Sequence, residues 1–154
     1  MGIGKSVIGN LVRSAAIGVA SGYLSQTGAA AVLINTPNNT LPKPLRSPWV
    51  RRLSLASAGG EMIANAHLSF LPRRTAPQPL GGRIAFGAGS AALLSSTQGR
   101  GLVIPIIAGG VSAAVASKFA SDSRAALARY VPDPLVGWAE NALAVGLSVL
   151  ATRR

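Results

Sequence analysis

Long runs of apolar and small residues, separated by short polar segments, dominate the chain. Each run is bounded by Arg, Lys or Pro, and together they predict five helices, near residues 12–34, 49–70, 83–98, 102–121 and 134–152. Because about 20 apolar residues cross the core of a bilayer, most of these runs approach the length of a membrane span. The pattern therefore predicts an all-α fold, a polytopic membrane helical bundle of about five short Gly/Ala-rich helices. No change in composition divides the chain, so we expect a single domain over residues 1–154.

Two of the expected helices leave alternatives open. The first follows Lys5 and Arg13 and includes the small-residue run 29–31, a pattern that a signal peptide with its cleavage site also shows. The third lies between Arg83 and Arg100, and its roughly 16 residues span only about 24 Å, less than the roughly 30 Å hydrocarbon core. It therefore needs snorkelling Arg side chains, local thinning of the bilayer or a partial crossing.

Composition strengthens the membrane interpretation and removes several kinds of chemistry. Apolar residues make up 49% of the chain and charged residues only 12%, about half the fraction usual in a soluble domain. The 18 Gly residues and the scarcity of aromatic residues favour closely packed helices over a β-sandwich. The chain has no Cys, which excludes disulfides, thiolate metal sites and Cys nucleophiles.

The net charge of +11 raises nucleic acid as a partner, but the positions of the cations favour a membrane surface. Most of the 15 cations lie between the apolar runs, singly or in pairs, where they can meet anionic lipid headgroups. We therefore expect no nucleic acid partner. The candidate contacts to headgroups or to a partner protein are Arg51, Arg52, Arg73, Arg74, Arg83, Arg153 and Arg154. Five crossings place eight cations on one side and seven on the other, so the orientation stays open.

Small residues recur at a spacing of four along the apolar runs. They are Ser14, Gly18 and Gly22; Ala56, Gly60 and Ala64; Ala85 and Gly89; and Gly109, Ala113 and Ser117. Such notches let helix backbones approach closely in lipid, so Gly18, Gly22, Gly60, Gly89 and Gly109 are predicted packing positions. These faces serve either packing within the bundle or contact with a second copy or a partner protein.

Two acidic residues, Glu61 and Glu140, fall inside predicted membrane spans. Asn65 follows Glu61 by one helical turn, and Asn141 follows Glu140 directly. Because an isolated carboxylate in a bilayer is costly, these four residues form a candidate intramembrane polar site. They either line a path for protons or cations, or belong to a structural network with Arg or His side chains.

Nothing in the sequence favours catalysis. His67 is the single histidine, and two remote Glu residues do not complete a metal site with it, so we expect no metal and no cofactor. The segment GIGKS at residues 2–6 lacks the first glycine and the preceding strand of a phosphate-binding loop. We therefore expect a protein that is not an enzyme.

Four segments carry a resemblance to a known family: AIGVASGYLSQTGAA, GGEMIAN, PRRTAPQPLGGRIAFGAGSAAL and VPDPLVGWAENALAVG. In their order and spacing they resemble the small bacterial integral membrane proteins of domain-of-unknown-function family 4126. The resemblance implies a polytopic membrane fold without an assigned activity. It places Glu61, Arg74, Arg83, Asp133 and Glu140 at motif positions of that family. The chain departs from the motif at 24–25, where the family has Arg, and at 65 and 141, where Asn replaces Asp.

These observations together predict a non-enzymatic integral membrane protein of the bacterial inner membrane. We expect it to act as an accessory or structural subunit that packs through its small-residue helix faces, as a homo-oligomer or within a larger membrane complex. The alternative is a small transporter or channel in which Glu61 and Glu140 line a polar path. A pore former of the phage type is a third option, suggested by the small size and the basic tail.

Overall fold

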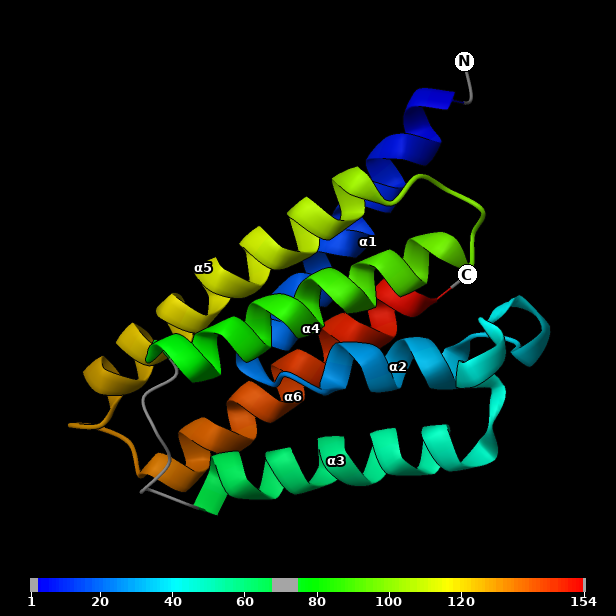
Figure 1. The fold of residues 1–154 in the computed structure, drawn as a ribbon. Coiled ribbons are helices and arrows are strands. Elements are labelled where there is room, and N and C mark those ends of the chain that lie inside the picture. Colours follow the sequence, from blue (N-terminus) through cyan, green and yellow to red (C-terminus); the bar gives the residue numbers. More distant parts are fainter. Residues whose placement is uncertain (1–2, 68–74, 154) are drawn as a thin grey trace.

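The computed structural model describes residues 3–67 and 75–153, which form an all-α bundle of six α-helices (Figure 1). The predicted all-α helical bundle is thus confirmed, with six α-helices in place of the expected five or so. The helices are α1 (Ile3–Tyr23), α2 (Thr27–Asn35), α3 (Pro48–His67), α4 (Pro77–Ser96), α5 (Val103–Leu127) and α6 (Asp133–Thr152). Two 3-10 turns, η1 (Asn38–Thr40) and η2 (Lys43–Arg46), occupy the Pro-rich connection between α2 and α3.

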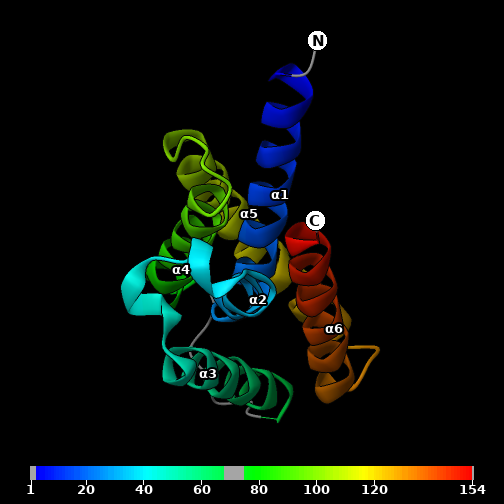
Figure 2. The ribbon, with the colours of Figure 1, turned by 90° about the vertical axis from the view of Figure 1, so that its right-hand side faces the viewer.

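Helix α1 is the centre of the bundle and contacts α4, α5 and α6 (Figure 2). In the C-terminal half of α1 the side chains of Ile17 and Ala20 are fully buried, as is Leu24, which directly follows the helix. Helix α2 turns back under this core, and α3 lies at the periphery, where it packs against α6 and α2. The core is built mainly of Ala, Gly and Ser, so the helices approach each other more closely than Leu-rich helices do.

The single helix predicted near 12–34 is wrong, because the chain breaks after Tyr23 and restarts as α2 at Thr27. The chain folds back so tightly that a Cβ on Gly28 would lie 2.6 Å from Oγ of Ser21. The break is stabilised from outside the segment, since Glu61 on α3 accepts hydrogen bonds from the backbone N–H groups at the start of α2. This explains why the apolar run alone predicts one continuous helix.

The other helix bounds differ at particular ends. Helix α4 begins at Pro77, six residues before the predicted start, because Pro is accepted in the first turn of a helix. With 20 residues it reaches about 30 Å, so the predicted shortfall in length does not occur. Helix α5 continues to Leu127 through the polar stretch after Ala120. Helix α3 ends at His67 in the described chain, and the predicted residues 68–70 lie outside the described residues.

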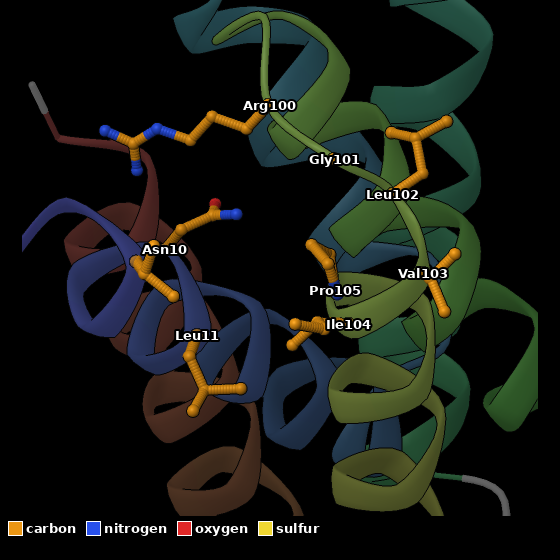
Figure 3. A pocket seen from close by; sticks show the side chains of 9 residues that line it. Asn10, Leu11, Arg100, Gly101, Leu102, Val103, Ile104 and Pro105 are labelled. Carbon is orange, nitrogen blue, oxygen red and sulfur yellow. The ribbon is translucent and has the colours of Figure 1, made fainter. Parts of the chain in front are cut away.

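Two helices of the described chain, α5 and α6, are long and apolar enough to cross a membrane by length and composition. The prediction counted five, but α3 carries two Arg, one Glu and one His within its 20 residues. On α5 the side chains of Ile107, Val111, Val115 and Phe119 recur every four residues, and each is about 60% exposed. This outward apolar stripe is what a lipid-facing helix presents. A hollow lies between α1 and the start of α5 (Figure 3).

Candidate functional site

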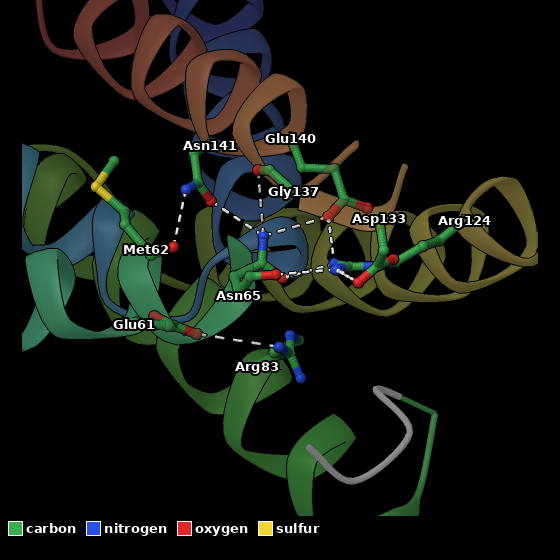
Figure 4. Close-up of polar contacts among 9 residues, drawn as sticks. All are labelled: Glu61, Met62, Asn65, Arg83, Arg124, Asp133, Gly137, Glu140 and Asn141. Atoms are coloured by element: carbon green, nitrogen blue, oxygen red, sulfur yellow. Dashed lines mark hydrogen bonds and ion pairs between the residues drawn. The ribbon is translucent and has the colours of Figure 1, made fainter. Parts of the chain in front are cut away.

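Three of the four predicted intramembrane polar residues meet where α3 packs against α6 (Figure 4). The side-chain amide of Asn65 donates to Oδ1 of Asn141 (3.0 Å) and to Oε2 of Glu140 (3.2 Å). Asn141 in turn donates from Nδ2 to the backbone oxygen of Met62 on α3 (2.9 Å). Because Asn65, Glu140 and Asn141 are all buried, these bonds satisfy groups that have lost water.

Arg124, near the end of α5, completes this cluster. Its Nε and Nη2 donate to the two carboxylate oxygens of Asp133, each at 2.6 Å, which is a bidentate pair. Its Nη1 donates to Oε2 of Glu140 and to Oδ1 of Asn65, both at 3.1 Å. Its Nη2 also donates to the backbone oxygen of Asn65 (2.9 Å). We call Asn65, Arg124, Asp133, Glu140 and Asn141 the Arg124 cluster; it joins α3, α5 and α6.

Helix geometry places the α6 members of the Arg124 cluster on one face. Asp133, Gly137 and Glu140 are separated by four and three residues, and Asn141 lies beside Glu140 on the same side. Gly137 lets α3 approach, because a Cβ there would lie 2.7 Å from Cα of Ala66. The sequence shows this spacing, so Asp133 and Gly137 could have been assigned to the same polar helix face as Glu140. The sequence does not single out Arg124 in this way, because Arg124 lies in a polar stretch.

Glu61, the fourth predicted residue, belongs to a separate set of contacts. Its two carboxylate oxygens accept the backbone N–H groups of Ser25 (2.8 Å) and Gln26 (2.9 Å). These donors lie at the N-terminal end of α2, where a negative charge also interacts favourably with the helix dipole. Arg83 on α4 lies 4.0 Å from Oε1 of Glu61. Glu61 therefore holds α2, α3 and α4 together.

The predicted packing glycines divide into two groups. Gly18, Gly22 and Gly109 lie at close helix contacts: a Cβ on Gly22 would come within 2.6 Å of the Ala113 oxygen. Ser117 of α5 adds a hydrogen bond from its Oγ to the Gly22 oxygen (3.0 Å). Gly60 and Gly89 are not at such contacts, because an added Cβ meets open space at both positions. On α4 the glycine that is buried at a close contact is Gly87 instead, two positions from Gly89.

Among the described residues, the arginines predicted to contact headgroups fall into two groups, those bound within the bundle and those exposed on its surface. The Arg83 side chain is only 13% exposed and faces Glu61, so it does not present a free cation to lipid. Arg51 donates from Nη2 to the Thr36 oxygen (2.8 Å), which attaches the start of α3 to the end of α2. Arg52 stacks over Trp49 at 5.6 Å and is exposed, as is Arg153. Arg73, Arg74 and Arg154 lie outside the described residues.

Metal ions in proteins are held by sets of His, Cys, Asp and Glu side chains, and His67 is the single histidine of this chain. Among the described residues, no group of three or more His, Cys, Asp or Glu side chains is placed to hold a metal ion. His67 packs edge-on against Trp138, with ring centroids 5.9 Å apart. The Arg124 cluster is thus an arrangement of hydrogen bonds and ion pairs that can fix helices relative to one another.

No family model, curated protein or solved structure matches the chain. The class that the fold and the site define is therefore an all-α bundle with two helices of membrane-spanning length and a buried polar cluster. The resemblance to domain-of-unknown-function family 4126 stays a prediction.

Proposed function

We propose that this chain is a non-enzymatic integral membrane protein that serves as an accessory or structural subunit in a membrane assembly. The single observation that carries the proposal is the division of its small-residue faces. One set, with Gly18, Gly22 and Gly109, is used inside the bundle, whereas the stripes with Gly60 on α3 and Gly89 on α4 face outward. An outward notch of this kind suits contact with another membrane helix.

The outer surface supports the membrane setting of this proposal. Exposed apolar side chains cover α5 at Ile107, Val111 and Val115, and α6 adds Leu135 and Leu150. In water such a surface is costly, whereas in a bilayer it is solvated by acyl chains. Basic residues in the connections are then at the level of anionic headgroups, in keeping with a bacterial inner membrane.

The alternative, a transporter or channel with Glu61 and Glu140 along one path, has less support. Glu140 is bound by Arg124 and Asn65, and Glu61 by two backbone N–H groups. The two carboxylates thus belong to different groups of contacts (Figure 4). Carboxylates engaged in this way favour a structural role over ion coordination.

Substituting Leu for Gly60 and Gly89 together tests the proposal. Both positions have open space, so the double variant should fold and extract from membranes as the wild type does. Its assembly should be lost, seen as a smaller particle on size-exclusion chromatography with light scattering in mild detergent. The matched control is Gly146→Leu, which also points into open space but lies on α6, a helix that carries neither of the two stripes.

A folding control and the contradicting outcomes complete this experiment. Gly22→Leu should prevent folding, because its side chain would overlap the α5 backbone. A wild-type protein that is monomeric and recovers no partner after gentle extraction would contradict the proposal, as would an unchanged assembly in the Gly60→Leu/Gly89→Leu variant.

A further inference from the structure

The hollow between the N-terminal part of α1 and the start of α5 has a volume of about 380 Å³ (Figure 3). Its walls are mostly apolar and include Val7, Leu11, Leu102, Val103, Ile104 and Pro105. Two polar side chains, Asn10 and Arg100, also line it. The hollow is therefore amphipathic, with a long apolar wall and a polar region.

Asn10 contributes an unusual polar group to this hollow. It is only 7% exposed, and its Nδ2 donates to Oγ of Ser95 (3.1 Å). Ser95 uses its single hydroxyl hydrogen to donate to the Gly101 oxygen (2.9 Å), so it must accept from Asn10, which fixes the orientation of the amide. Within the described chain, Oδ1 of Asn10 then has no hydrogen-bond partner. A buried acceptor without a partner is costly, and a ligand with a donor group would relieve that cost.

Arg100 supplies positive charge at the same place. It is exposed, and in Figure 3 its side chain extends across the hollow above Asn10. A guanidinium binds phosphate oxygens through several N–H donors in a fixed plane. Helix α6 ends at this end of the bundle (Figure 1), and the exposed Arg153 that directly follows it adds a second cation. The polar region of the hollow thus suits an anion rather than a zwitterion.

We propose that this hollow binds one anionic phospholipid from the bilayer, a proposal that rests on the membrane setting argued above. An acyl chain lies along Val7, Leu11 and Ile104; Val7 and Ile104 are half or more exposed without it. The phosphate is held by Arg100, and a headgroup hydroxyl satisfies Asn10. A bilayer lipid is the occupant because α5, which forms one wall, is a helix of membrane-spanning length.

Native mass spectrometry of the full chain in detergent, titrated with phosphatidylglycerol or phosphatidylcholine of identical acyl chains, tests this site. One phosphatidylglycerol should bind about ten-fold more tightly than phosphatidylcholine, a difference of about 1.4 kcal/mol. Arg100→Gln should reduce phosphatidylglycerol binding to the level of phosphatidylcholine. Ile104→Trp should weaken binding of both lipids by filling the apolar part of the hollow.

Matched controls separate the site from general lipid adhesion. Arg129→Gln removes an exposed cation away from the hollow, and Ile107→Trp adds the same bulk at a similarly exposed α5 position outside it. Equal binding of the two lipids by the wild type would overturn the proposal and indicate surface lipid only. So would identical behaviour of Arg100→Gln and Arg129→Gln, or of the two Trp variants. Loss of lipid binding would leave membrane extraction and the assembly test above unaffected, so a failure of this proposal can be distinguished from a failure of the proposed function.

Discussion

At the scale of single residues, Arg124 shows how one guanidinium can fix three helices. Its planar fork of donors pairs with both oxygens of Asp133, while Nη1 reaches Glu140 and Asn65. A Lys at this position would carry the same charge but could not hold the two oxygens of Asp133 in a plane. The residue therefore acts through geometry as well as charge.

We expect Arg124→Gln to lower the free energy of unfolding by about 3 kcal/mol, because it leaves two carboxyl groups without their shared cation. Thermal or denaturant unfolding in detergent, followed by circular dichroism, measures the change. The control is Lys118→Gln on the same helix, whose ion pair with Asp122 is 73% and 64% exposed and should contribute little. If the two variants unfold alike, the Arg124 cluster is not a stabilising element.

The members of the Arg124 cluster could be predicted only in part from the sequence. Glu140, Asn65 and Asn141 stand out because charged and amide side chains inside apolar runs need partners. Arg124 does not stand out, because cations are common in the polar stretch where it lies. Its role depends on α5 continuing to Leu127, which brings the guanidinium beside the start of α6.

At the scale of helices, the spacing of glycines along a helix indicates where another helix can pack closely. It predicts the contact correctly only when the face that turns toward the bundle interior is known. Gly109 packs against α4 at Gly87, where a Cβ would lie 2.7 Å from the Gly109 oxygen. The spacing-four rule selected Gly89 instead, because Ala85 and Gly89 form an equally good stripe. A repeat of small residues predicts a notched face, and the rest of the fold determines whether that face turns inward.

Gly137→Ala tests the close approach of α6 to α3. The added methyl group would meet the backbone of Ala66, so the helices must separate and the free energy of unfolding should fall by about 1–3 kcal/mol. Gly146→Ala on the same helix points into open space and should be neutral or stabilising by up to about 1 kcal/mol. The same unfolding measurements distinguish them, and an equal effect of the two substitutions would argue against the contact.

The helices themselves follow from apolar runs bounded by charge or Pro, and α6 was predicted to within one residue. The break between α1 and α2 was missed because its cause lies far along the chain, in the hydrogen bonds that Ser25 and Gln26 make to Glu61. Local pattern predicts that a segment is helical. It does not reveal a carboxylate that arrives from another helix and caps a new one.

At the scale of the whole molecule, a set of Asn, Ser, Thr and Glu side chains is buried inside the bundle, while large apolar side chains face outward on α5 and α6. The Arg124 cluster and the Glu61 contacts place charged groups against partners within the bundle. This is the arrangement that a bilayer favours, because lipid cannot satisfy polar groups but solvates apolar ones. The account therefore depends most on the chain being embedded in a membrane.

Alkaline carbonate extraction of bacterial membranes containing the chain tests that claim most directly. High pH releases peripheral proteins held by charge, whereas a protein with helices embedded in the hydrocarbon core stays with the lipid. We predict that the chain remains in the membrane pellet and is released only by detergent. Recovery of folded protein in the carbonate supernatant, or in the soluble fraction before extraction, would contradict the account.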